Sequence, residues 1–480
     1  MSIAELLKVE EGKTLEFKRD ISSPRNLLKT LVAFANTAGG RIIIGVTDKT
    51  RQPIGIDNPL DEEERLCNLI ADAISPRLVP NVEMTTVDGK TVLVVEVFLS
   101  NARPHYLHSE GPETGVYVRL GSTNRQADRE LVGELRRSIE GVSFDELPLP
   151  DLSIDDLDME AAQKAFAGVR KLDEQALLTL KLLTRHQNKQ VPTKGGMLLF
   201  GRQRTQHFSD AWVQCGRFLG TEKIDIFDHI DIDVPLPQAV DEVMLFLKKH
   251  AYRGADLTEV RRRDVWSIPL GILREVIINA LVHSDYSQRG APIRVVFLDD
   301  RIEVESMGIL LPGLTIEGMK QGTSRIRNPV IARVFKELHL IEQWGTGVRR
   351  IFAEARDLGL REPKIEEIGL RLRFTVYLAE PHRIQSGKQG AQAGTTTEQV
   401  TEQVTEQVKR LLSVLKDNEL GSKDAMLSLH LNHRPTFLYD YLQPSLSGGL
   451  IEMTQPHSPK SPTQKYRLTE KGKQVLEGGK

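Results

Sequence analysis

A low-complexity segment near residue 390 does most to limit how this chain can fold. The stretch 382–408, HRIQSGKQGAQAGTTTEQVTEQVTEQV, is rich in Gln, Gly and Thr, so it cannot bury a core of its own. We expect its first part to be disordered. Its TEQV repeats place Val400, Val404 and Val408 four residues apart and predict the start of a helix. The residues that follow must therefore form a domain with a separate core.

Length and composition set the remaining bounds. A chain of 480 residues exceeds one ordinary core and predicts about three or four domains. The formal net charge is -2, so any contact with nucleic acid has to come from local basic patches. Cys67 and Cys215 stand alone, which argues against structural zinc and against a disulfide framework. With no signal-like segment and no apolar run of membrane-spanning length, we expect a cytoplasmic protein without membrane contact.

The first 140 residues alternate between helical and strand-like patterns. Apolar residues recur at helical spacing over 24–38 and 61–74, and RIIIGV, VEMTTV and TVLVVEVF have the length and β-branched composition of strands. This alternation predicts an α/β or α+β domain. The segment 143–160 is acidic and marked by prolines, so we interpret it as a linker or surface strap. Beyond it, GGMLLFG and AWVQCGRFLG are strand-like.

Three carboxylates near the N-terminus are candidates for a metal site. Glu11 and Glu16 flank a short turn that enters the strand LEFK, and Asp48 follows the strand RIIIGV. If neighbouring strands bring them together beside Lys18, they suit Mg²⁺ or Mn²⁺, which could activate water against a phosphodiester. The alternative is that they are solvated acids at strand ends, where Asp and Glu are mostly exposed. The spacing is compatible with both.

The Gly-Lys-Thr triplets at residues 12–14 and 89–91 resemble the end of a nucleotide-binding P-loop. A P-loop also needs an earlier glycine that lets the backbone amides curl around the phosphates. Leu7 and Met84 stand where that glycine should be. Neither triplet therefore belongs to a P-loop, and the chain is not expected to be a P-loop helicase.

Several stretches of the first 130 residues resemble the Schlafen AlbA-type domain. They are E-x4-EFK, LVAFANTAGGRIIIGVTD and RPHYLHSEGPETGVYVRLGSTNRQA, which together cover most of residues 10–130. The resemblance implies a nucleic-acid-binding domain of bacterial regulators. By their charge, Lys18, Arg119 and Arg125 are candidates for phosphate contacts, and a solvated turn is an equal alternative for the two arginines. The resemblance also implies that the three carboxylates match the acidic triad with which animal Schlafen nucleases cut tRNA and rRNA.

The helix LREVIINALVHSDY carries a second candidate site. Glu275 and Asn279 are four residues apart and share a helical face. Asn offers a neutral oxygen to Mg²⁺, and Glu can orient or deprotonate a water. A capping or interface pair is an equal alternative on this spacing alone. Downstream, RIEVESMGILLPG is a strand entering a glycine turn, and EQWGTGVRRI is a glycine loop opening onto a helix, an arrangement that receives phosphates.

Residues 265–380 resemble the GHKL ATP-binding fold, in the variant that often follows an AlbA-type domain and is labelled after a RecG-like helicase C-terminus. The Glu and Asn of the helix match the N-box, and Gly308, Gly345 and Gly347 match the two glycine boxes. The resemblance implies an α/β sandwich that binds ATP with Mg²⁺. The asparagine would hold the metal, and the glutamate would be the base of a weak ATPase.

One position departs from that pattern. Ser306 stands where an active GHKL protein has the Asp that receives the adenine amino group. Serine can accept a hydrogen bond but brings no charge. We therefore expect nucleotide binding rather than efficient turnover, and an inert scaffold with degenerate sites stays open as an alternative.

The C-terminal block has the pattern of a winged helix. A first helix follows the TEQV repeats, Ser422 is placed to cap a second, a third begins near Thr436, and two short strands flank a proline-rich basic hairpin. In a winged helix the third helix reads the major groove of DNA. The alternative is a winged helix used for protein contacts. The predicted contacting residues are Arg434, Thr436, Lys460 and Lys465.

Together these patterns predict a multidomain α/β and α+β protein. The leading hypothesis is a cytoplasmic bacterial nucleic-acid-binding regulator, a homo-oligomer that acts in transcription and carries an ATP-binding switch. The alternative is a metal-dependent Schlafen-like nuclease that cuts RNA or DNA in phage defence. The expected parts are an AlbA-type domain over 1–140, a connecting α/β region over 141–262, a GHKL-like domain over 263–380, a flexible linker over 381–405 and a winged helix over 406–480.

Overall fold

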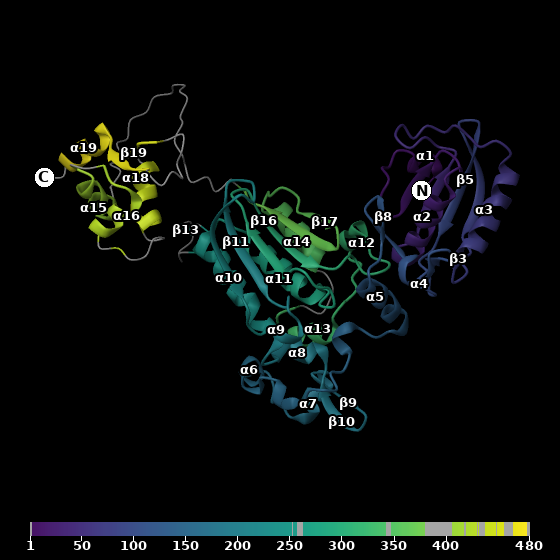
Figure 1. The fold of residues 1–480 in the computed structure, drawn as a ribbon, viewed down its shortest axis with the longest axis horizontal. Coiled ribbons are helices and arrows are strands. Elements are labelled where there is room, and N and C mark those ends of the chain that lie inside the picture. Colours follow the sequence, from purple (N-terminus) through teal and green to yellow (C-terminus); the bar gives the residue numbers. More distant parts are fainter. Residues whose placement is uncertain are drawn as a thin grey trace. The chain divides into compact units, whose positions relative to one another are not determined.

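The structure of the chain, a computed structural model, divides into two units, residues 1–381 and 382–480, which are described separately (Figure 1). No described helix is long and apolar enough to cross a membrane. The residues that the structure describes are 2–251, 253–256, 263–341, 347–379, 406–416, 419–429, 431, 437–447, 449–455 and 464–477.

The N-terminal domain is built on a four-stranded sheet of order β1-β2-β5-β4. Strands β1 and β2 are parallel and the other neighbours are antiparallel. Ile42, Ile44 and Val95 face a core formed with helices α2 and α3, whereas Phe17 and Ile43 face the short helix α1. The predicted helices and strands are confirmed, with bounds β1 Leu15–Lys18, α2 Pro24–Thr37, β2 Gly40–Ile44, α3 Pro59–Ala73, β4 Asn81–Val87 and β5 Lys90–Val97. Helix α1, Ile3–Leu6, was not predicted.

The rest of this domain is made of short elements and one longer helix, α5. Asp128 caps α5 by accepting a hydrogen bond from the Leu131 amide at 2.8 Å, and Gly141 ends it in a left-handed conformation with φ +72°. The apolar face of α5 packs on the hairpin β7-β8. The bounds are β3 Ile74–Ser75, β6 Tyr106–Leu107, α4 Gly111–Thr114, β7 Tyr117–Leu120, β8 Thr123–Gln126 and α5 Arg129–Glu140.

Replacing Gly39 with alanine is expected to destabilise this domain by about 1–3 kcal/mol. Gly39 joins α2 to β2 at φ +73°, and a Cβ atom there would lie 2.8 Å from the Val97 carbonyl oxygen. Gly89→Ala is the matched control, because Gly89 has φ +71° but no atom within 4 Å of its Cβ position. Hydrogen exchange of β2 and β5 in the full chain measures the difference. Equal effects would show that the close approach contributes nothing.

The central domain is built on a six-stranded sheet of order β12-β11-β15-β16-β18-β17. Only β11 and β15 are parallel neighbours. Helices α10, α11 and α14 pack together, and α11 contacts β16 and β18 (Figure 1). The bounds are β11 Val213–Leu219, β12 Asp225–Ile232, α10 Leu236–His250, α11 Leu270–His283, β15 Ile293–Phe297, β16 Arg301–Met307, α12 Ile316–Gln321, α13 Pro329–Glu337, α14 Gly347–Asp357, β17 Lys364–Ile368 and β18 Arg371–Tyr377.

The segment expected as a connecting region shares this sheet and its core. Strands β11 and β12 lie before residue 262 and belong to the same sheet as β15 to β18, because β11 pairs with β15. One apolar cluster runs from Leu157 to Leu378. Residues 141–262 and 263–380 therefore share one sheet and one apolar core. The further elements are α6 Met159–Ala165, α7 Glu174–Thr179, β9 Leu183–His186, β10 Lys189–Pro192, α8 Lys194–Phe200, α9 Arg204–His207, β13 Arg253–Asp256 and β14 Arg263–Trp266.

The prediction of a strand at GGMLLFG was wrong, because these residues form helix α8. The Thr193 side chain caps the helix by accepting a hydrogen bond from the Gly196 amide at 2.9 Å. The helix is buried on nearly every side, so its apolar run lacks the polar face by which a helix is usually recognised. Gly196 permits the packing, since a Cβ atom there would lie 2.2 Å from the Leu182 carbonyl oxygen.

The C-terminal unit has a core of its own, formed by residues such as Leu411, Phe437 and Leu468. The prediction that Ser422 caps helix α16 was wrong, because Ser422 is the first residue of the helix and its N-cap is Gly421. Residues 432–436, which include the predicted start of the third helix near Thr436, and residues 456–463, in the predicted basic hairpin, lie outside the described residues. The elements are α15 Glu406–Val414, α16 Ser422–Ser428, a π-helical turn Phe437–Leu442 leading into α18 Gln443–Ser447, the antiparallel strands β19 Ile451–Met453 and β20 Tyr466–Leu468, and α19 Glu470–Glu477.

Candidate nucleotide pocket and nucleic-acid interface

A cavity of about 480 Å³ opens in the central domain between α11, β16, α13 and the start of α14. Segment 308–314, which follows β16, forms a further wall. Much of the lining consists of apolar side chains that come from α11, from the sheet and from segment 308–314. Examples are Val276, Ala280, Val304, Ile309, Leu311 and Phe374. Such a wall can receive the flat face of an aromatic ring.

The predicted pair on α11 lies in this cavity. Asn279 donates from Nδ2 to Glu275 Oε1 at 3.3 Å, and Arg350 of α14 donates to Glu275 Oε2 at 3.1 Å. Gly347 begins α14 directly beside the pair, since a Cβ atom there would lie 1.9 Å from Glu275 Oε1. The prediction that Glu275 and Asn279 share one face of the helix is therefore confirmed. Because Gly347 has no side chain, the start of α14 can approach this face closely.

The first glycine box also borders the cavity. Ser306, which is buried, and Gly308 both line it. Gly308 has φ +104°, and a Cβ atom there would lie 3.0 Å from the guanidinium carbon of Arg327. Glycine is therefore required at this turn by conformation and by space. Gly345 of the second glycine box lies outside the described residues.

Sequence reasoning missed the cations of this cavity. Five cationic side chains line it against a single carboxylate, that of Glu275, among the lining residues that the structure describes. Burial and the nearby Arg327 lower the pKa of His283, which also lines the cavity, to about 4, so this ring is neutral at pH 7. An anionic ligand fits this balance. The cations are Arg325, Arg327, Arg333, Lys336 and Arg350.

In the N-terminal domain, Glu16 is engaged by two cations. Its side chain is 9% exposed, and its two oxygens pair with Lys18 and with Arg119. The Arg119 side chain is 1% exposed; it also donates to the Gly12 carbonyl at 3.0 Å and to Asn124 Oδ1 at 3.0 Å. Glu16 therefore belongs to a buried ion-pair cluster that joins β1 to β7 and β8.

The structure does not assemble the predicted metal triad. Glu11 accepts a hydrogen bond from the Phe17 amide at 2.8 Å, Glu16 is held by its cations, and Asp48 is exposed in the turn after β2. Within the described part of the chain, no group of three or more His, Cys, Asp or Glu side chains is placed to hold a metal ion. Each carboxylate has different partners: a backbone amide for Glu11, two cations for Glu16 and solvent for Asp48. The spacing of the three residues in the sequence could not reveal these partners.

The predicted phosphate contacts differ in exposure. Lys18 is partly exposed and Arg125 is exposed, whereas Arg119 is buried and cannot reach a ligand in this structure. Lys465, next to β20, is exposed. The other predicted contacts of the C-terminal unit, Arg434, Thr436 and Lys460, lie outside the described residues.

Three family models match separate segments of the chain. Residues 11–128 match "Schlafen, AlbA_2", and residues 290–378 match "Putative ATP-dependent DNA helicase recG C-terminal". These matches confirm the AlbA-type resemblance and the RecG-type resemblance over residues 290–378, a range that begins after Glu275 and Asn279. Residues 406–469 match "Filamentation induced by cAMP protein Fic-like, C-terminal domain", so the winged helix stays a prediction.

Solved structures show weaker likenesses. A crystal structure of a Corynebacterium diphtheriae protein is 20% identical, covers 97% of this chain and 94% of that one, and has a TM-score of 0.42. The solution structure of the N-terminal domain of a RecG-related protein from Nitrosomonas europaea is 29% identical over 26% of this chain and 90% of its own, with a TM-score of 0.22. A Fic family protein from Desulfovibrio desulfuricans G20 is 17% identical over 72% and 77%, with a TM-score of 0.14. No curated protein matches the chain.

Proposed function

We propose that this protein is a nucleic-acid-binding regulator whose central domain binds ATP with Mg²⁺. The observation that carries the nucleotide part is the lining of the cavity, where five cations and one carboxylate lie beside an apolar wall. Two of these cations, Arg327 and Arg350, pair with Glu134 and Glu275, and Arg325, Arg333 and Lys336 add further positive charge. A nucleoside triphosphate has a flat base for such a wall and a polyanionic tail for the cations. Asn279 would offer its side-chain oxygen to the Mg²⁺ ion that accompanies the phosphates.

Binding fits this cavity better than rapid hydrolysis. Glu275, the candidate base, is already engaged by Arg350 and Asn279. Ser306 brings no charge to the adenine end. When bound, Mg²⁺ would neutralise phosphate charge. We therefore propose a nucleotide that acts as a signal, which requires that it bind one conformation better than another.

The nucleic-acid part of the proposal is supported by the AlbA-type match and by one exposed and one partly exposed cation of the N-terminal domain. Lys18 and Arg125 are the candidates there. In the C-terminal unit, helices followed by the antiparallel pair β19-β20 support a second DNA-binding module of winged-helix type, with Lys465 beside the hairpin. A role in transcription and a homo-oligomeric state belong to the same proposal, because paired DNA half-sites favour paired subunits.

Replacing Lys336 with glutamine is expected to weaken the binding of Mg–ATPγS about tenfold or more and to leave adenosine binding unchanged. Lys336 lines the cavity from α13, and a charge-assisted phosphate contact contributes roughly 1.5–3 kcal/mol. Calorimetry at constant ionic strength measures both ligands.

Lys320→Gln is the matched control for this experiment. Lys320 is a neighbouring cation on α12 that pairs with Glu362 and does not line the cavity. No binding of Mg–ATPγS to the unmutated protein would refute the proposed function. An equal loss for adenosine would refute the assignment of Lys336 to the phosphates.

A further inference from the structure

We infer that segment 308–314 and Arg327 couple the nucleotide cavity to the N-terminal domain, so that nucleotide binding strengthens the docking of that domain and the docked domain raises nucleotide affinity. The inference rests on the proposed nucleotide function and adds to it the route by which a bound nucleotide reaches the nucleic-acid-binding domain. Three independent sets of contacts carry it.

The first set is the segment itself, whose residues serve two surfaces. Ile309 lines the cavity and is also buried in the apolar cluster of β7 and α5 that includes Val118 and Leu131. At the far end of the segment, the Gly313 amide donates to the Thr37 carbonyl of α2 at 2.7 Å. One short stretch of backbone is therefore both a wall of the cavity and a docking surface for the N-terminal domain.

The second set is a buried ion pair behind the segment. Lys13, next to β1, pairs with Glu367 of β17 at 2.7 Å, and the two side chains are 10% and 4% exposed. The same carboxylate accepts a hydrogen bond from the Leu310 amide at 2.8 Å. Lys13 of the N-terminal domain and Leu310 of the cavity wall thus share one acceptor. If the N-terminal domain moved away, Glu367 would lose its ion pair with Lys13 and keep the hydrogen bond from the Leu310 amide.

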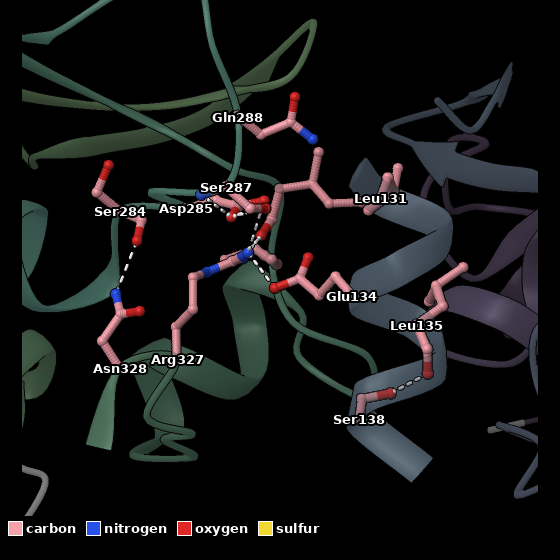
Figure 2. A network of polar contacts seen from close by, with 12 residues as sticks. Leu131, Glu134, Leu135, Ser138, Ser284, Asp285, Ser287, Gln288, Arg327 and Asn328 are labelled. Atoms are coloured by element: carbon pink, nitrogen blue, oxygen red, sulfur yellow. Dashed lines mark hydrogen bonds and ion pairs between the residues drawn. The ribbon is translucent and has the colours of Figure 1, made fainter. Parts of the chain in front are cut away.

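The third set is the network around Arg327, which Figure 2 shows between α5 and the start of α13. Arg327 lines the cavity and is 7% exposed. Its guanidinium donates to Glu134 of α5 and to the Ile309 carbonyl, and lies 3.6 Å from Asp285 Oδ2. Arg327 is therefore a positioning residue that fastens the wall to the N-terminal domain.

These contacts favour a switch between discrete states rather than a gradual shift. Separating the domains would break a buried ion pair on each side of the segment, and a partner that stays buried without its counter-charge costs several kcal/mol. Gly308 and Gly313, both with positive φ, stand at the two ends of the segment, where the backbone can turn most freely. A ligand that contacts segment 308–314 only when the N-terminal domain is docked must favour docking. The effect is reciprocal, so docking must raise the affinity for that ligand.

The test compares Mg–ATPγS binding and hydrogen exchange in the full chain. For the unmutated protein, Mg–ATPγS is expected to slow exchange in residues 116–135, which do not line the cavity. In the double variant Lys13→Met, Glu134→Gln, nucleotide affinity is expected to fall about tenfold, within the usual range of coupling between sites. Exchange in 308–314 is expected to rise. The control is Arg136→Gln, on α5 but paired with Glu113 inside the N-terminal domain.

The outcomes separate the inference from the proposed function. If the unmutated protein binds Mg–ATPγS but exchange in 116–135 stays the same with and without it, the coupling is refuted while the nucleotide function stands. This comparison needs no variant, so a folding defect in the double variant cannot obscure it. Equal affinity in a folded double variant and in the unmutated protein would also refute the coupling. No nucleotide binding at all would overturn both.

Discussion

Replacing Arg119 with methionine will destabilise the N-terminal domain by about 3–5 kcal/mol, because it leaves the buried carboxylate of Glu16 with Lys18 as its only cation. The Arg119 guanidinium also satisfies Gly12 and Asn124, and it lies 5.3 Å from the centre of the Phe34 ring. Removing it therefore opens β1, α2 and the hairpin β7-β8 together. Hydrogen exchange of these elements in the full chain, as a function of urea concentration, measures the loss.

Arg41→Met is the matched control for this prediction. Arg41 pairs with Glu96 across β2 and β5, but the two side chains are 37% and 25% exposed. Partly exposed ion pairs contribute only about 0–1 kcal/mol. If both variants lose the same stability, the Glu16–Arg119 pair does not hold the domain together.

This ion pair also changes how a nuclease should be tested. Glu16→Gln would leave Arg119 buried without its carboxylate, so lost cleavage in that variant could report unfolding as easily as a lost metal ligand. Asp48 is exposed and can be changed to asparagine without this effect. Metal-dependent cutting that disappears in Asp48→Asn would therefore be the more informative result.

The stability of the first unit is expected to fall by up to about 4 kcal/mol as the pH rises from 4 to above 7, through the titration of Asp145. Burial raises the pKa of this carboxyl from 3.8 to about 7 against two backbone hydrogen bonds that lower it. Between these values the folded state holds a proton that the unfolded state has lost. Protonation thus favours folding, and the advantage disappears once the pH exceeds the folded pKa.

Asp145→Asn is expected to flatten this pH dependence. Asp145 is fully buried, and its Oδ2 accepts from the amides of Val330 and Ile331, at 2.7 and 3.1 Å, at the start of α13. An amide oxygen can accept the same two bonds without a charge. Urea unfolding followed by the fluorescence of the chain's tryptophans, which are few and lie in the first unit, measures the slope.

Asp173→Asn provides the comparison for this variant. Asp173 caps α7 by accepting a hydrogen bond from the Ala176 amide at 2.8 Å, but it is exposed. Its replacement should change stability little, because asparagine caps a helix about as well as aspartate, and the pH dependence should persist because Asp145 is intact. A slope that survives in Asp145→Asn would assign the pH dependence to other groups.

Local patterns predicted most elements and one site. Glu275 and Asn279 share a face because four residues make about one helical turn, and the structure keeps both in the cavity. The strands around Ile42 and Val95 were readable because their apolar runs are short and β-branched. Helix α8 was predicted as a strand because it is buried on nearly every side. Such a helix lacks the periodic alternation of apolar and polar residues by which a helix is distinguished from a strand.

The sequence by itself determined the α/β character of the first unit, the glycine turns at Gly39 and Gly308, and the Glu275–Asn279 pair of helix α11, because each depends on residues within a few positions of one another. Tertiary structure alone decided which charges meet. It buried Arg119 against Glu16, left Asp48 exposed, gathered the cations of α13 and α14 around the cavity, and joined Lys13 to Glu367 across 354 residues of chain. The strength of a charge in a protein depends on its burial and partners, and these are set by contacts between distant segments that no local pattern records.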